Sequence, residues 1–237
     1  MISVRSFWHH GRAPAEGNGR PYHREIEMLN ADQILFQLRE IAVQWTKLAL
    51  LFHVYFGIIA AALIGGVRPS QRSAARILAV PLISVSAIAW VEGNPFNGTV
   101  FAVLWIFLLI ASGRLPKERV RIAPAGLMVP GLLLFLFGWA YPHFLETRPV
   151  WAYLYLAPTG LIPCPTLSIL TGLVLILDGL GSRTICLVFG LAGLLYGAIG
   201  VFRLGVVIDA VLILGAFALL AAAFAKKPTP AIPARTG

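Results

Sequence analysis

The fold class of this chain is decided by residues 185–224, ICLVFGLAGLLYGAIGVFRLGVVIDAVLILGAFALLAAAF, which hold only two charged side chains, Arg203 and Asp209. A helix needs about 20 mostly apolar residues to cross the hydrocarbon core of a bilayer. This stretch is therefore long enough for two crossings, with a tight turn near Arg203. It predicts an antiparallel pair of membrane-spanning helices.

The same pattern extends outward from this pair over most of the chain. Hydrophobic residues make up 58% of the 237 residues and charged residues 12%, about half the roughly 25% charged share of a soluble domain. The expected spans are 46–66, 74–91, 97–113, 122–142, 165–181, 184–202 and 204–225. We predict an all-α, polytopic transmembrane helical bundle of about seven spans over residues 46–225. A count of six, with one span merged or demoted, is the alternative.

The orientation of the bundle follows from the gaps between spans, because short cytoplasmic loops are enriched in lysine and arginine. The basic gaps alternate along the chain and hold Arg68, Arg72, Arg76, then Arg114, Lys117, Arg119, Arg121, then Arg183, and finally Lys226 and Lys227. We therefore expect a cytoplasmic C-terminus and an N-terminus outside. The net charge of +9 is explained by this topology, so we expect no nucleic-acid partner.

Aromatic residues give a second signal for the orientation. Tryptophan and tyrosine favour the membrane interface, because one part of each ring is apolar and another is polar. The residues near the expected outer ends are Trp45, Trp90, Trp139, Tyr141, Trp151, Tyr153 and Tyr155. Both signals place the same ends of the spans outside.

The segments that flank the bundle have a different composition. Residues 1–29 are rich in Gly, Pro, His and Arg and have no apolar core of signal-peptide length, so we expect a disordered tail. Met28 is a candidate for the natural start. Residues 226–237 are predicted to form a disordered cytoplasmic tail.

Residues 30–45 have a helical apolar period. Ile34, Leu38, Ile41 and Trp45 recur at spacings of four, three and four, with polar residues on the other faces. This pattern predicts an interfacial amphipathic helix that lies in the membrane plane before the first span. A simple extension of that span is the alternative.

Five polar residues gather in the outer half of the expected bundle. They are His53, Glu92, Asn97, His143 and Asp209. Ionisable groups inside spans are costly and often functional, so we predict an outward-facing polar pocket that binds a cation or relays protons. Plain structural pairing, such as Asp209 with Arg203, is the alternative. Two histidines and two carboxylates would suit zinc or copper, but no metal-binding spacing exists. The metal question stays open, and we expect no cofactor.

A second candidate feature is the outer motif Pro163-Cys164-Pro165-Thr166. Two prolines around one residue impose an extended approach to a helix, and proline suits a first helical turn. A rigid helix start is one interpretation, and a functional thiol at Cys164 is the other. Cys186 is expected at the opposite membrane face, too far away for a disulfide. Gly193 and Gly197 predict a face on which another helix packs closely.

Several of these features together resemble a family of bacterial multi-pass membrane proteins, domain of unknown function 6064. The resemblance covers residues 30–225. It is carried by the amphipathic helix, Asn94-Pro95-Phe96-Asn97, the segment from Ala157-Pro158 to Pro163-Cys164-Pro165-Thr166, and Leu204-Gly205 with Asp209. It implies a helical bundle in a bacterial inner membrane. Members are often labelled permeases, but the resemblance implies no mechanism.

The sequence therefore favours an integral membrane protein that is permease-like for a small solute or ion. We find no phosphate-binding loop, nucleophile elbow, zincin pattern or dinucleotide fingerprint, so an enzyme or redox protein using Cys164 or the histidines is less favoured. The main alternative is a non-catalytic accessory or assembly subunit. The expected partners are the lipid bilayer, a small solute or ion, and other subunits of a membrane complex.

Overall fold

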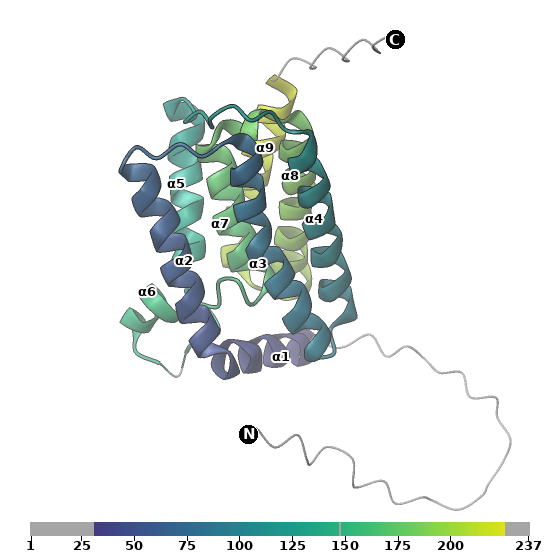
Figure 1. The fold of residues 1–237 in the computed structure, drawn as a ribbon. Helices are drawn as coiled ribbons and strands as arrows, with labels where there is room; N and C mark the ends of the chain where they lie inside the picture. The colour runs from purple at the N-terminus through teal and green to yellow at the C-terminus, as the bar shows by residue number, and fades with distance from the viewer. Residues whose placement is uncertain (1–30, 147, 226–237) are drawn as a thin grey trace, which may run out of the picture.

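The structure is a computed structural model that describes residues 31–146 and 148–225 (Figure 1). Within these ranges it is all-helical, and no strand forms. The main helices are α1 (Ala31–Gln44), α2 (Thr46–Ile64), α3 (Gln71–Val91), α4 (Pro95–Arg114), α5 (Ala125–Trp139), α6 (Tyr153–Leu156), α7 (Pro163–Ile176), α8 (Arg183–Ala198) and α9 (Ala210–Ala225). Short helical turns cover Val150–Ala152, Asp178–Gly181, Ile199–Arg203 and Val207–Asp209. The tails predicted at 1–29 and 226–237 lie outside the described residues.

Every expected span contains one of these helices. Five are long and apolar enough to cross a membrane: α2, α3, α4, α8 continued to Arg203, and α9 with the turn that begins at Val207. The other two, α5 and α7, are apolar but shorter, with 15 and 14 residues. The all-helical, membrane-type architecture is thus confirmed, whereas the number of seven crossings stays a prediction.

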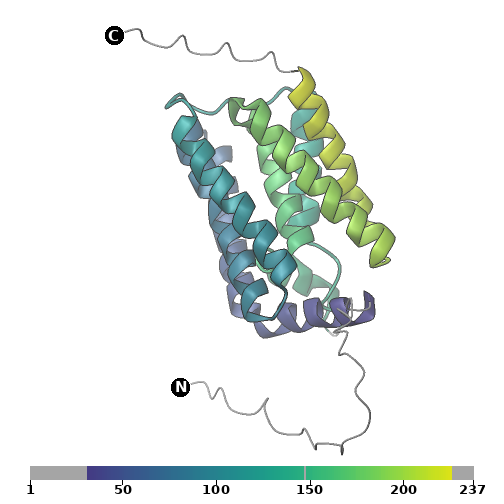
Figure 2. The same ribbon diagram turned by 90° about the vertical axis from the view of Figure 1, so that its right-hand side faces the viewer.

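Helix α7 lies in the interior of the bundle, with α5, α8, α9 and α3 around it (Figures 1 and 2). Every side chain from Pro165 to Leu175 is buried. The helix ends at Ile176, earlier than the expected span 165–181, because Asp178, Gly179, Leu180 and Gly181 all have positive φ. Such a left-handed run cannot continue a right-handed helix.

Glycines set the closest helix contacts. A Cβ on Gly172 would come within 2.5 Å of the Gly131 carbonyl oxygen, and one on Gly131 within 2.8 Å of the Gly172 oxygen, so α5 and α7 touch through backbone. On α8, a Cβ on Gly193 would meet the Ala216 Cβ of α9 at 3.1 Å. The predicted close packing along the glycine face of α8 is confirmed, and α9 is its partner.

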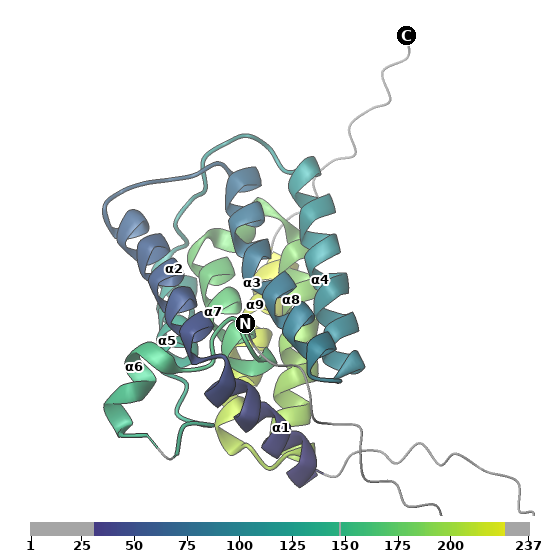
Figure 3. The ribbon, with the colours of Figure 1, turned by 60° about the horizontal axis from the view of Figure 1, so that its bottom comes forward.

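Helix α1 lies across one end of the bundle, at a steep angle to the long helices (Figures 1 and 3). Its buried residues Leu38, Ile41 and Ala42 join a cluster with loop residues that include Tyr141 and Ile162. The loops that hold the basic residues lie at the other end, where α9 finishes (Figure 1). The predicted position of this helix in a membrane interface stays a prediction.

Candidate functional site

A cavity of about 330 Å³ lies under α1, at the end of the bundle opposite the basic loops. Ligand sites in proteins typically measure about 300–1,000 Å³, so this cavity can hold one small molecule. Its walls come from α1, the start of α4, the loop after α5, the start of α7 and the turn between α8 and α9. The residues that line it include Ile34, Leu38, Phe96, Asn97, Tyr141, Phe144, Ile162, Pro163, Cys164, Tyr196, Ile199, Gly200, Arg203, Leu204, Val206 and Asp209.

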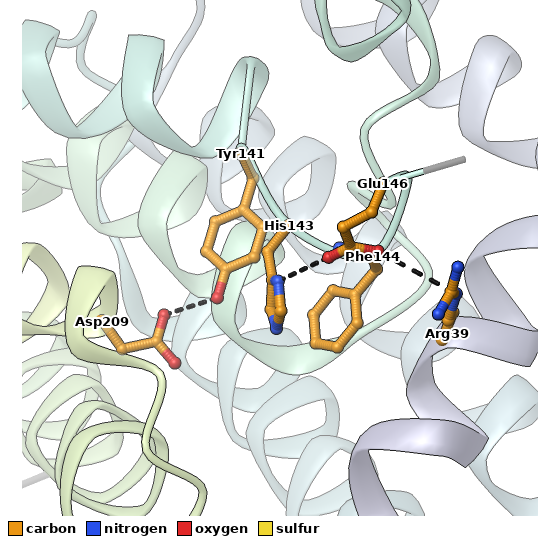
Figure 4. A network of polar contacts seen from close by, with 6 residues as sticks. All are labelled: Arg39, Tyr141, His143, Phe144, Glu146 and Asp209. Atoms are coloured by element: carbon orange, nitrogen blue, oxygen red, sulfur yellow. Dashed lines mark hydrogen bonds and ion pairs between the residues drawn. The ribbon is translucent and has the colours of Figure 1, made fainter. Parts of the chain in front are cut away.

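Asp209 is the buried acidic residue of this cavity. Only 1% of its surface is exposed, and the Tyr141 hydroxyl donates a 2.7 Å hydrogen bond to its Oδ1 (Figure 4). The Cys164 thiol is its second side-chain hydrogen-bond partner. Asp209 is therefore held by two neutral groups from α7 and the loop after α5.

The backbone between α8 and α9 makes room for this carboxylate. Helix α8 ends in a π-helical turn over Ile199–Arg203, and Gly205 then takes a φ of +71°. The Val206 N–H donates to the Gly200 carbonyl oxygen at 2.8 Å, which closes the turn. A Cβ on Gly200 would overlap Oδ2 of Asp209. Glycine at this position therefore allows the carboxylate to lie against bare backbone.

A second hydrogen-bonded pair forms the α4 side of the cavity. The Tyr196 hydroxyl of α8 donates to Oδ1 of Asn97 at 3.0 Å. Asn97 itself is 8% exposed, and the Asn94 side chain caps α4 by accepting from the Asn97 N–H. The predicted pocket residue Asn97 thus lies in the cavity, held by a tyrosine that the sequence did not single out.

The loop after α5 carries a polar network that reaches α1 (Figure 4). His143 Nδ1 lies 2.8 Å from Glu146 Oε1, and Arg39 Nε lies 3.9 Å from Glu146 Oε2. Partial burial raises the pKa of Glu146, but backbone N–H groups, including that of Phe144, and the neighbouring His143 and Arg39 outweigh it and hold the pKa below its ordinary value. This network links the loop after α5 to α1.

His143 stands beside the cavity and does not line it. Its imidazole lies between Asp209 and Glu146 in Figure 4 and interacts electrostatically with Asp209. Its Nε2 is buried and has no hydrogen-bond partner among the described residues. His143 is thus close enough to influence the charge of the cavity.

Two residues of the predicted pocket lie elsewhere. The ring nitrogens of His53 lie 2.9 Å from the Ala49 carbonyl oxygen and 3.0 Å from that of Trp139, so His53 joins α2 to α5. Glu92 accepts a 3.0 Å hydrogen bond from the Trp45 indole. Neither lines the cavity, and both have structural partners.

The outer motif contributes to the site through its first half. Pro163 and Cys164 line the cavity, whereas Pro165 and Thr166 are buried inside the bundle. The Thr166 hydroxyl donates to the Ile162 carbonyl oxygen at 2.7 Å and accepts from the Gly160 N–H at 2.8 Å. Pro163 occupies the first turn of α7, so the motif does build a rigid helix start. Neither cysteine forms a disulfide.

Two other roles were considered for these polar residues: a metal site, and an ion pair between Asp209 and Arg203. In residues 31–146 and 148–225, no group of three or more His, Cys, Asp or Glu side chains is placed to hold a metal ion. Arg203 lines the same cavity as Asp209, but the two form no ion pair. Glu146 forms ion pairs with Arg39 and His143 instead.

The sequence did not predict that Tyr141 and Tyr196 line the cavity. Tyr141 was noted in the sequence as an aromatic near an outer span end, which is equally typical of a membrane interface. Its complete burial and its bond to Asp209 depend on the packing of distant segments. Tyr196 had no sequence signal beyond its place in an apolar span.

Comparison with known proteins gives no relative for this chain: no family model, no curated protein and no solved structure matches it. The resemblance to domain of unknown function 6064 therefore stays a prediction.

Proposed function

We propose that this chain is a permease-like protein of a bacterial inner membrane that takes a small solute from the outer side into the cavity at Asp209. Seven helices would cross the bilayer, with the N-terminus outside and the C-terminus in the cytoplasm. The five long apolar helices support the membrane location. The shorter α7 fits because it is surrounded by protein, and neighbouring helices can shield short or irregular segments from lipid.

The observation that carries this proposal is a buried carboxylate facing a cavity of ligand size. A polar group in the interior of a membrane bundle is costly and is usually retained for a functional reason. Mostly apolar walls with a few convergent polar groups are typical of small-molecule sites. Asp209, with Tyr141 and Cys164 around it, has this arrangement.

The test is uptake into proteoliposomes that contain the full chain. The probes are radiolabelled amines, sugars, amino acids and monovalent cations, offered one at a time. Uptake of at least one class should exceed that of empty liposomes and fall at least tenfold in the Asp209→Asn variant. Glu92→Gln is the matched control, because Glu92 lies outside the cavity and glutamine can still accept from Trp45. Normal uptake by Asp209→Asn would contradict the proposal.

An exposed apolar surface on α2 also supports the alternative function, an accessory subunit of a membrane complex. The apolar residues Leu51, Val54 and Ile58 of α2 are exposed by 60%, 52% and 65%. Lipid would cover such a surface, and so would another membrane subunit. Stoichiometric copurification of a partner from native membranes in mild detergent would favour this alternative. A monomer that still takes up solute would exclude it.

A further inference from the structure

We propose that the ligand of the Asp209 cavity is a small organic ammonium compound with an apolar body. Its cationic nitrogen would pair with the Asp209 carboxylate, and its body would lie against the aromatic and aliphatic walls. This inference rests on the proposed function, since it names the chemical class of the solute.

The charge of the cavity points to a cation. A buried charge is normally paired, because leaving it unpaired in a poorly solvated interior is costly. The two side chains that hydrogen-bond Asp209, Tyr141 and Cys164, are both neutral donors. His143 interacts electrostatically with Asp209, but its Nδ1 already contacts Glu146. A ligand ammonium would supply the charge that Asp209 lacks within the described residues.

The aromatic rings point the same way. Four of them line the cavity: Phe96, Tyr141, Phe144 and Tyr196. Ring faces attract ammonium groups, and the attraction is stronger where the contact is shielded from water. Both tyrosine hydroxyl protons are already donated, to Asp209 and Asn97. The tyrosine oxygens thus have only lone pairs left to offer a ligand, which suits a donor such as an ammonium group.

The remaining walls favour an organic cation over a metal ion. Ile34, Leu38, Ile162 and Leu204 supply aliphatic carbon. Hard metal cations need about six oxygen ligands, whereas the cavity has a single carboxylate. A hydrocarbon body bearing one amine matches both the walls and the charge.

Arg203 sets the limit on ligand charge. It lines the cavity and its residue surface is exposed, so it stands at the opening. A second positive charge on the ligand would face this guanidinium. The site should therefore prefer a monocation.

The test is calorimetric titration of the full chain in lipid nanodiscs with three phenylalkyl probes. These are 4-phenylbutylamine, 4-phenylbutanol and 4-phenylbutyrate, which share one body and differ in charge. Titrations into empty nanodiscs are subtracted to remove partition into lipid. The amine should bind at least tenfold more tightly than either other probe. Asp209→Asn should weaken amine binding at least tenfold and leave the alcohol unchanged, whereas Glu92→Gln should retain the preference.

A second variant covers the case in which Asp209→Asn fails to fold. Gly200→Ala keeps the carboxylate but displaces it, because the new Cβ overlaps Oδ2. It should lose the amine preference and still bind the alcohol.

Three outcomes would overturn the inference: equal binding of the amine and the alcohol, tighter binding of the carboxylate, or no binding of any probe to the wild-type chain. The uptake panel decides the proposed function separately. Uptake of sugars that depends on Asp209 would preserve that function and refute the ammonium ligand.

Discussion

Tyr141 is completely buried, and its hydroxyl donates to the carboxylate of a helix 68 residues further along the chain. The ring stacks beside Phe144 and meets Phe137 edge to face. Tyr141 therefore holds the Asp209 carboxylate in one orientation at the wall of the cavity. Because Tyr141 lies in the loop after α5 and bonds a residue just before α9, it also joins the two sides of the site.

Replacing Tyr141 by phenylalanine should destabilise the protein. The variant leaves Asp209 without its tyrosine donor, and a buried polar group that loses a partner costs about 1–3 kcal/mol. The measurement is the free energy of unfolding in mixed detergent micelles. Tyr55→Phe is the control, because the Tyr55 hydroxyl donates to the Ile77 carbonyl oxygen in an exposed contact. Equal losses in the two variants would contradict this role of Tyr141.

Glu146 makes the stability of the folded protein depend on pH. Its pKa in the folded protein is lowered, so the folded state favours the carboxylate form, and the stabilisation is fully present above the ordinary value of 4.5. It is lost as the pH falls through the lowered pKa. The difference in melting temperature between wild type and Glu146→Gln should be positive at neutral pH and vanish in strong acid. The side chain is 46% exposed, so the effect is small. A difference that grows on acidification would refute this account.

At the scale of helices, hydropathy predicted where the seven helices of the bundle lie, because a bilayer demands long apolar runs. All seven expected spans coincide with helices of the structure. Position along the helices was predictable too: Asn97 and Asp209 were expected at similar depths in the bundle, and both line one cavity. It did not give the direction in which a side chain points around its helix. His53 and Glu92 have suitable depth, but they face Trp139 and Trp45 instead.

The turn between α8 and α9 is a second feature that could not be predicted in detail from the sequence. The sequence predicted a tight connection near Arg203, but not its π-helical form, in which the Leu204 N–H donates to the Ile199 carbonyl oxygen. Residue 200 must be glycine because the Asp209 side chain packs directly against its backbone. Such a relation requires the folded hairpin and leaves no periodic signal in the sequence.

The contact of α5 with α7 provides a prediction at this scale. In Gly172→Ala the new Cβ would come within 2.5 Å of the Gly131 carbonyl oxygen and 2.6 Å of the Phe135 nitrogen. These are backbone atoms, so the helices must separate, and overpacking of this kind costs about 1–3 kcal/mol. The same unfolding measurement checks it. Gly126→Ala in α5 is the control, because its Cβ would meet nothing within 4 Å. A neutral Gly172→Ala would contradict the close packing.

The molecule as a whole has two unlike ends. One end carries the loops with Arg68, Lys117 and Arg119, and those two loops are joined by backbone hydrogen bonds such as Val120 N–H to Pro69 O. The other end carries α1, the polar network and the cavity. The proposed orientation places the first end in the cytoplasm and the cavity outside.

Single cysteines introduced at the two ends should react from opposite sides of the membrane. The positions are Val150, which is 82% exposed near the cavity end, and Lys117 in a basic loop. Both native cysteines are replaced by alanine. In right-side-out vesicles a membrane-impermeant maleimide should label Val150→Cys and spare Lys117→Cys. Labelling of both from one side would show that α5 does not cross the bilayer.

The measurement that tests the central claim most directly is the accessibility of Cys164, the cysteine that lines the cavity. It is made in a Cys186→Ala background, with a small membrane-impermeant thiol reagent and sealed vesicles of both orientations. An outward-facing cavity predicts modification in right-side-out vesicles, slowed at least tenfold by saturating 4-phenylbutylamine. Modification only in inside-out vesicles, or only after denaturation, would contradict a cavity that opens to the outside.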